Sequence, residues 1–370
     1  MNGYHADPAD DSVVGDRPAE DLRNRTSIAL FDNCRGVRKT TLTYHLAHMF
    51  RRLGMTVLAV DLDPQANLTA MCLDETEIEE LWDNESELIA QGAASSALPG
   101  TGRVNTGQTI ADAVRPVLEG TGDVAPIEPA QLQPGLWLLA GSLDLSRFED
   151  KLSNEWFKTF AGDIAAIRTT TAFHRVVEQA ADLVGADIVL IDVGPNLGAI
   201  NRAALIAADS VLMPLAADLF SLKGLSNLGP TLRGWRRDWQ QLVLPRVREG
   251  FSAPRAEMRP LGYVIMQPEM RLDRPLKAYE RWLQRIPWVY SAAVLGERVP
   301  VCADDRYRIA TLRNYRSLMP LALDARKPMF DLKAADGALG STQKYVQTCY
   351  REFRDLAEGV LARVRQLGTE

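Results

Sequence analysis

Residues Ser27 to Thr41 read SIALFDNCRGVRKTT, an apolar run followed by a polar turn and a Lys-Thr-Thr triplet. From Lys39 to Leu53, apolar side chains recur at helical spacing, and Gly54 can end the helix. Thr56 to Asp61 (TVLAVD) is then a second run of strand length. Only one residue separates Gly54 from this second run. So short a connection between the helix and the next strand favours a parallel pair of strands joined by a right-handed crossover. The segment therefore predicts a βαβ unit.

The rest of the chain repeats this alternation. Further apolar runs suited to buried strands lie at Leu136 to Ala140, Asp187 to Asp192, Ser210 to Pro214 and Leu261 to Met266. Helical patterns separate them, including Thr169 to Val184, and a last helix is expected from about Thr342 to Leu367. Nearly continuous apolar strands alternating with helices are typical of a parallel sheet covered on both faces. The sequence therefore predicts an α/β, doubly wound, mostly parallel fold.

The organisation of the chain follows from its composition. Residues 1–25 are rich in Asp, Pro and Arg without apolar periodicity, which predicts a flexible arm. Residues 26–370 are expected to form a single domain. Within it, about 84–130 turns to Ala, Gly, Ser, Thr and Pro, which indicates a loop-rich insertion with one modest helical stretch. The part at about 270–370 is expected to be mainly helical.

Length and composition exclude several classes of protein. The chain has 370 residues, of which 46% are hydrophobic and 24% charged, as in ordinary globular proteins. No uninterrupted apolar stretch is long enough to span a membrane, and no signal segment is expected. None of the four cysteines forms a CxxC pair, so neither a zinc ribbon nor a disulfide framework is supported. These features predict a cytoplasmic protein with free thiols.

Charge is distributed unevenly along the chain, although the net charge is only -6. Residues 1–199 hold 15 Lys and Arg against 30 Asp and Glu, whereas residues 200–330 hold 21 against 12. The basic part contains an arginine group made of Arg233, Arg236, Arg237, Arg246 and Arg248. Each of these residues can equally belong to a solvated helix face, but as a group they favour contact with a nucleic-acid backbone.

Polar residues follow three of the predicted strands at the point where each strand ends. These stretches are 32–41 (DNCRGVRKTT), 61–69 (DLDPQANLT) and 192–196 (DVGPN). Ligands of doubly wound sheets bind at the carboxyl ends of the strands. A Lys-Thr-Thr triplet that opens a helix can offer backbone N–H groups, an ammonium and a hydroxyl to polyphosphate and Mg²⁺. Aspartates at two other strand ends can hold that magnesium and orient water.

These motifs resemble those of the ParA/MinD family of P-loop ATPases, whose signature is a deviant Walker A loop of the form KGGxGKT[TS]. The resemblance extends over most of the chain and implies a sheet of seven or eight strands. The stretch 61–69 is very similar to the family's switch I pattern DxDPQxN, and Asp192 matches the Walker B aspartate. The stretches 141–152 (GSLDLSRFEDKL) and 214–225 (PLAADLFSLKGL) look like further family blocks.

The resemblance also implies roles for individual residues. Lys39 would hold the β- and γ-phosphates of ATP, and Asp63 would orient the attacking water, so these two are the candidate catalytic residues. The candidate nucleotide-binding residues are Gly36, Val37, Arg38, Lys39, Thr40, Thr41 and Pro214. The candidate Mg²⁺ site comprises Thr40, Asp61 and Asp192.

The phosphate loop departs from the family pattern. The family's signature lysine falls on Cys34, and two of its three glycines fall on Arg35 and Arg38, which leaves Gly36 alone. Glycine suits such a loop because the backbone must approach phosphate closely. Two hypotheses follow: either the arginines contact phosphate as guanidinium donors and ATP still binds, or the site is degenerate and the chain is a catalytically silent scaffold in a regulatory or defence complex.

In the first hypothesis, the resemblance implies an ATP-dependent homodimer that acts in plasmid or chromosome partition or in cargo positioning. It would associate with nonspecific DNA, and hence with the nucleoid, and would work with a ParB-like partner away from membranes. His45 and His48 lack an acidic partner at ligand spacing, so a place on a helix surface or in the core is favoured over metal binding.

Overall fold

The computed structural model describes residues 25–32, 39–82, 108–267, 276–297, 305–315 and 317–369. The predicted arm, apart from Arg25, lies outside these residues, and so do the substituted positions of the phosphate loop and residues 83–107 of the predicted insertion. Arg25 forms ion pairs of 2.6 Å with both Glu178 and Asp182.

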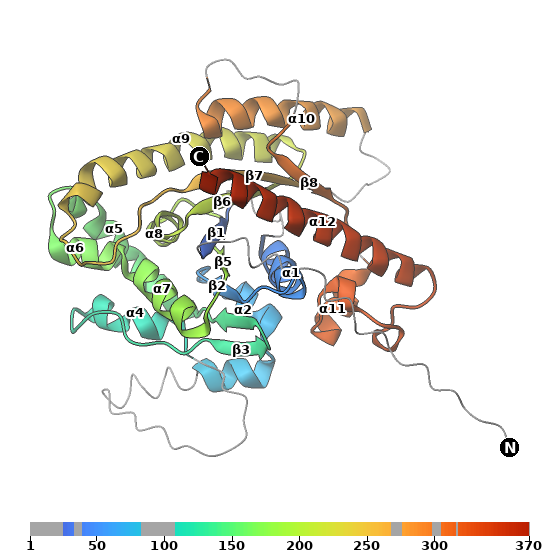
Figure 1. Cartoon of the computed structure of the whole chain (residues 1–370), viewed down its shortest axis with the longest axis horizontal. Helices are drawn as coiled ribbons and strands as arrows, with labels where there is room; N and C mark the ends of the chain where they lie inside the picture. Colours follow the sequence, from blue (N-terminus) through green and yellow to red (C-terminus); the bar gives the residue numbers. More distant parts are fainter. Residues whose placement is uncertain are drawn as a thin grey trace.

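An eight-stranded sheet runs through the centre of the molecule (Figure 1). Its strands are β1 (Thr26–Leu30), β2 (Val57–Asp61), β3 (Ala130–Gln133), β4 (Leu136–Leu139), β5 (Ile188–Asp192), β6 (Ser210–Leu215), β7 (Arg259–Met266) and β8 (Arg308–Leu312). Their order in the sheet is β3-β4-β2-β5-β1-β6-β7-β8. Only the β3–β4 pair is antiparallel among these strands, so the predicted mostly parallel α/β fold is confirmed.

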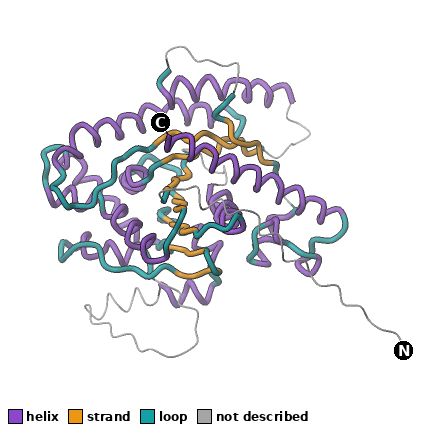
Figure 2. The backbone as a smooth tube through the Cα atoms, in the orientation of Figure 1, coloured by secondary structure: helices purple, strands orange, loops and turns teal. Residues whose placement is uncertain are grey.

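Helices cover both faces of the sheet (Figure 2). One face carries α1 (Lys39–Arg52), α2 (Asn67–Cys72), α11 (Leu318–Ala325) and α12 (Ser341–Thr369). The other carries α4 (Ile110–Glu119), α5 (Phe148–Thr159), α6 (Ile164–Thr170), α7 (Ala172–Val184), α8 (Ala199–Ala207), α9 (Leu219–Asp238) and α10 (Leu276–Val289). Strand β1 shows why: Ile28 and Leu30 face the first layer and Ala29 the second, because side chains alternate along a strand.

Short helical turns connect several of these elements. They are η2 (Leu143–Arg147), η3 (Trp239–Val243), η4 (Leu244–Arg246), η5 (Tyr290–Leu295), η6 (Met329–Asp331) and η7 (Ala334–Asp336).

At residues 108–133, within and beyond the predicted insertion, the chain forms α4 and β3. Helix α4 begins with a capping box between Thr109 and Asp112, and its apolar side joins the core against α7.

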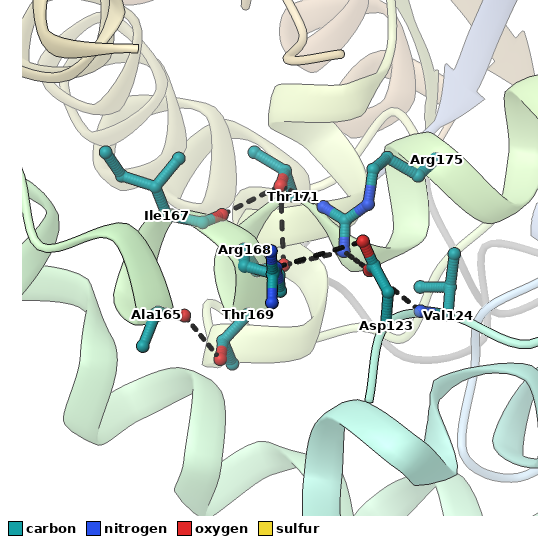
Figure 3. Close-up of polar contacts among 8 residues, drawn as sticks. All are labelled: Asp123, Val124, Ala165, Ile167, Arg168, Thr169, Thr171 and Arg175. Carbon is teal, nitrogen blue, oxygen red and sulfur yellow. Dashed lines mark hydrogen bonds and ion pairs between the residues drawn. The ribbon is translucent and has the colours of Figure 1, made fainter. Parts of the chain in front are cut away.

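The helix predicted from Thr169 to Val184 is wrong in its first part, because α6 and α7 are separate helices that meet at Thr171. The buried Arg175 side chain fills this junction (Figure 3). It donates to the Thr171 hydroxyl, to Asp123 Oδ1 at 2.7 Å and to the Arg168 carbonyl at 3.0 Å. The junction is therefore stabilised by a long-range ion pair to the loop after α4, which no periodicity of the sequence reveals.

Of the two places that the sequence left open for His45 and His48, a helix surface or the core, the structure shows the core. The His45 Nδ1 atom is 2.7 Å from the Thr41 carbonyl, and its Nε2 accepts from the Met329 N–H at 3.0 Å. Burial lowers the pKa of His45 to about 4, so the neutral ring is the stable form.

In the part of the chain that the structure describes, no helix is long and apolar enough to cross a membrane.

Candidate nucleotide site at the ends of β1, β2 and β5

Two neighbouring strands of the sheet, β2 and β5, bring the predicted carboxylates together. Strand β5 lies between β2 and β1, and Asp61 at the end of β2 is the register partner of Asp192 at the end of β5. Both side chains are fully buried, and Asp63 is 7% exposed. We call Asp61, Asp63 and Asp192 the carboxylate cluster.

Asp61 is held by hydrogen bonds from the following turn. Its Oδ2 accepts from both the N–H and the hydroxyl of Thr69 at 2.8 Å, and the Gly141 N–H donates to that hydroxyl at 2.9 Å. Burial raises the pKa of Asp61 to about 6, although the bonds from Thr69 act in the opposite direction. Asp61 is therefore a fixed carboxylate with a reduced tendency to ionise in the absence of a cation.

Asp192 is the least satisfied member of the cluster. Burial, followed by the charge of Asp61, raises its pKa to about 8, against a hydrogen bond from Thr40. Its Oδ1 accepts from the Thr43 hydroxyl at 3.2 Å, while its buried Oδ2 has no hydrogen-bond partner among the described residues. A buried carboxylate oxygen without a partner is costly, and a hard divalent cation would satisfy it.

The unsatisfied oxygen of Asp192 makes the described residues suitable for Mg²⁺. Among them, no group of three or more His, Cys, Asp or Glu side chains forms a cage that could hold a metal ion by itself. Mg²⁺ is usually bound by one or two carboxylates and completes its shell with water and phosphate oxygens. Asp192, with Thr40 beside it, is the part of the predicted Mg²⁺ site that the geometry supports most directly.

The first residues of α1 face the same site. The Lys39 side chain is buried, and its ammonium donates to the Asp32 carbonyl at 2.8 Å, next to the end of β1. Thr40 and Thr41 are half-buried. Pro214 is buried in β6, the neighbour of β1 on its other side. Gly36, Val37 and Arg38 lie outside the described residues.

Asp63 lies against the loop that follows β5. Its Oδ1 accepts from the Gln65 N–H at 3.0 Å, and a Cβ atom added to Gly194 would lie 3.4 Å from the same oxygen. A carboxylate at this position, slightly exposed beside two deeper carboxylates, is suited to orient a water molecule.

Sequence reasoning singled out the stretch 141–152 but assigned no role to one of its residues, Glu149. The Glu149 carboxylate, from the first turn of α5, accepts from the backbone N–H groups of Ala199 and Ile200 at 2.6 and 2.8 Å. These N–H groups begin α8, which follows the loop after Asp192. The two partners are about fifty residues apart along the chain, so no local pattern reveals the contact.

The arginine group is arranged differently. Arg233 donates to the Ala293 carbonyl, Arg237 pairs with Asp238 at 2.9 Å, and Arg246 donates to the Leu242 carbonyl. Arg246 and Arg248 line a pocket of about 260 Å³ together with Arg168. Arg233 and Arg236 line another pocket of about 230 Å³. Apart from the half-buried Arg236, these side chains are exposed, and the two pockets share no lining residue, so the group does not form one enclosed site.

The sheet order, the Lys-Thr-Thr start of α1 and the aspartates that end β2 and β5 are those of the P-loop NTPase fold. The chain matches the family described as "AAA domain" over residues 25–242. Together with its similarity to ParA and Soj proteins, this match shows that the chain belongs to the ParA/MinD family.

Individual relatives illustrate the extent of this similarity. The chain is 29% identical to the chromosome-partitioning ATPase Soj of Thermus thermophilus, over 55% of this chain and 60% of that protein. The matched part spans 51% to 64% of the length of the first four curated relatives.

Solved structures share the fold. Protein DIP2308 of Corynebacterium diphtheriae superposes with a TM-score of 0.60 at 20% identity, covering 91% of this chain and 98% of that one. A McdA variant of Cyanothece in complex with ATP gives a TM-score of 0.55 at 14% identity, covering 92% and 96%. Other relatives are a probable plasmid-partitioning protein ParA of Thermus thermophilus, at 27% identity over 64% of this chain and 58% of that protein, and the chromosome partitioning protein ParA of Caulobacter vibrioides, at 27% identity over 55% and 61%.

Proposed function

We propose that this protein is an ATP-dependent dimerising switch for plasmid or chromosome partition or for cargo positioning. In this proposal it binds ATP and Mg²⁺ between two copies of the chain, associates with nonspecific DNA and responds to a ParB-like partner. It would act in the cytoplasm, on the nucleoid when bound to DNA.

The observation that carries the proposal is the carboxylate cluster beside Lys39 and Thr40. Asp192 holds a buried oxygen without a hydrogen-bond partner in the described part of the chain, and its pKa is raised to about 8. A protein gains nothing in stability from such a group, so its place at the ligand-binding edge of the sheet supports a cation-dependent function.

Each residue would have a separate task in the bound state. Asp192, Asp61 and the Thr40 hydroxyl would hold Mg²⁺. Lys39 would exchange the Asp32 carbonyl for phosphate oxygens, a stronger, charge-assisted partner. Asp63 would orient water. Mg²⁺, when bound, supplies charge neutralisation between the phosphate oxygens.

A second candidate is the catalytically silent scaffold. It is favoured by the replacement of the signature lysine by Cys34 and of two glycines by Arg35 and Arg38. Loss of a preorganised cation should weaken hydrolysis more than binding, because developing charge is greatest in the transition state.

Isothermal titration of the purified protein with ATP and Mg²⁺ separates the two candidates, followed by phosphate release with and without nonspecific DNA. Saturable Mg²⁺-dependent binding supports the switch, whereas no binding at millimolar ATP overturns it. If ATP binds, the combined variant Cys34→Lys, Arg35→Gly and Arg38→Gly should raise turnover. Unchanged turnover would mean that these substitutions do not limit the reaction.

DNA association needs its own test. Charge reversal at Arg246 and Arg248 should weaken binding to a nonspecific duplex and flatten its salt dependence, because fewer counterions are released. Arg236→Glu with Arg237→Glu tests the α9 part of the group in the same assay. A salt dependence that neither pair alters would show that the arginines belong to a solvated face.

A further inference from the structure

The segment between Gly141 and Glu149 contacts the chain that follows β2 and the chain that follows β5, and the carboxylate cluster lies where these two strands end. At its start, the Gly141 N–H donates to the Thr69 hydroxyl, which in turn donates to Asp61. A Cβ atom at Gly141 would lie 2.9 Å from the Asp61 carbonyl oxygen, so the two backbones are in direct contact. The segment therefore supports the loop after β2.

At its other end, Glu149 caps α8. The first N–H groups of a helix have no partner within the helix, and a carboxylate there both satisfies them and interacts favourably with the helix dipole. Glu149 does this with both of its oxygens. Gly198 leaves the necessary room, because a Cβ atom there would lie 2.7 Å from Glu149 Oε1.

The loop after β5 is built on this capped turn. Asn201, in the first turns of α8, accepts from the Gly194 N–H at 3.1 Å and donates to the carbonyls of Gly194 and Asn196 at 2.9 and 2.8 Å. Gly194 in turn lies against Asp63. A continuous set of contacts thus runs from Glu149 through α8 to the carboxylate that would orient water.

From these contacts we propose that Glu149 is a positioning residue and that residues 141–149 couple the loop after β2 to the loop after β5. The contact between Gly194 and Asp63 then depends on the cap at α8, although Glu149 itself touches neither loop carboxylate. The consequence for ATP turnover rests on the proposed function, whereas the coupling of the two loops does not.

Hydrogen exchange of the nucleotide-free protein tests the coupling. Glu149→Gln removes the charge from the cap and should speed exchange about tenfold at residues 194–202 and also, more weakly, at residues 64–69. Glu149→Asp keeps the charge but shortens the reach, so it should fall between wild type and Glu149→Gln. Strand β1 and α12 should be unchanged in both variants.

Asp150→Asn is the matched control, since Asp150 is exposed on the same turn of α5 and shares its helix dipole. It should exchange as the wild type does. Faster exchange confined to residues 199–202 would show that Glu149 is only a helix cap, and an equal change in the Asp150→Asn variant would show a general effect of charge. Either result overturns the proposal.

Nucleotide measurements give the second readout. Glu149→Gln should lower kcat about tenfold and change the Kd for ATP by less than about threefold, because Lys39 and Thr40 are untouched. Equal losses in kcat and in ATP affinity would contradict a positioning role. If the wild type binds no ATP, the proposed function fails, while the exchange experiment still decides whether the two loops are coupled.

Discussion

The carboxylate cluster and the arginine group satisfy their charges in opposite ways. Asp61 and Asp192 are fully buried, and Asp61 is fixed by hydrogen bonds within the chain. Most of the arginines are exposed and donate to backbone carbonyls or pair with an adjacent acid. A buried charge must find its partner within the site or from a ligand, whereas an exposed charge has water. This difference is the reason why we propose a small ligand for the first region and a contact surface for the second.

Asp192→Asn gives the largest expected effect. It should weaken Mg²⁺-dependent ATP binding by about 100-fold, because it removes a negative ligand of the cation. The melting temperature of the ligand-free protein should rise, since a buried charge next to Asp61 is lost. The pKa of Asp192 is raised to about 8 in the folded protein, so keeping this residue costs the wild type stability as the pH rises from 4 to 8. The gain in stability from Asp192→Asn should therefore be greatest above pH 8.

Calorimetric titration with and without Mg²⁺, together with thermal melts at pH 6 and 9, measures both effects. Arg237→Ala is the control from the arginine group and should change neither quantity. Unaltered Mg²⁺-dependent affinity in Asp192→Asn would remove the carboxylate cluster from the nucleotide site.

A matched pair of glycine substitutions compares the rigidity of the two regions. Gly141→Ala places a Cβ atom 2.9 Å from the Asp61 backbone and should cost about 1–3 kcal/mol of unfolding free energy. Gly234→Ala, inside α9 among the arginines, meets nothing within 4 Å and should gain about 0.5–1 kcal/mol through helix propensity. Chemical denaturation measures both. Equal effects would mean that the cluster is no more tightly packed than the surface.

Lowering the pH should reduce the free energy of unfolding through His45, which is buried between α1 and the core. The pKa of His45 is about 4 in the folded protein and near 6.5 when unfolded, so the unfolded chain binds more protons between these values. The contribution of His45 should therefore fall by about 2 kcal/mol from pH 7 to pH 5, since protonation of Nε2 breaks the bond from Met329.

Denaturation of wild type and His45→Gln at both pH values isolates this residue from the other histidines. A difference between the two proteins that is the same at pH 7 and pH 5 would contradict the assignment. The arginine group keeps its charge over this range, so DNA binding should not follow the same pH dependence.

Single substitutions in the arginine group should have the smallest effects. Arg248→Ala should change stability by no more than about 0.5 kcal/mol, because the side chain is exposed. If Arg248 contacts a phosphate, the slope of log affinity for DNA against log salt concentration should become smaller by about 1, the value for one lost phosphate contact. Melting curves and fluorescence anisotropy at several salt concentrations test this, and a large loss of stability would show that Arg248 has a structural role.

The central strands and the carboxylate cluster could be predicted from the sequence because local patterns determine them. Strands such as β1 and β5 are buried on both faces and read as continuous apolar runs, and the residue after each run falls at the ligand-binding edge. For His45 the sequence left a helix surface and the core open, and the structure places the side chain in the core.

Other features depend on contacts that no local pattern contains. Strands β3 (AQLQ) and β8 (RIATL) were missed because they are short, partly exposed edge strands without a clear apolar run. Arg175 at the break near Thr171 pairs with Asp123, and α8 is capped by Glu149, each across a long distance in the sequence. The predicted roles of the nucleotide, Mg²⁺ and DNA residues stay predictions, since burial and geometry place these residues without showing what they bind.

The two edges of the sheet limit how copies of this chain can assemble. Strand β3 has four residues with a register shift opposite β4, and β8 has five residues and begins at Arg308, which pairs with Asp305. Short, irregular or charged edges resist pairing with further strands. Neither edge is suited to extend the sheet into a neighbouring molecule, so growth into fibres by strand addition is disfavoured. In the proposed function, contacts with a partner or with DNA would therefore use side-chain surfaces and not strand edges.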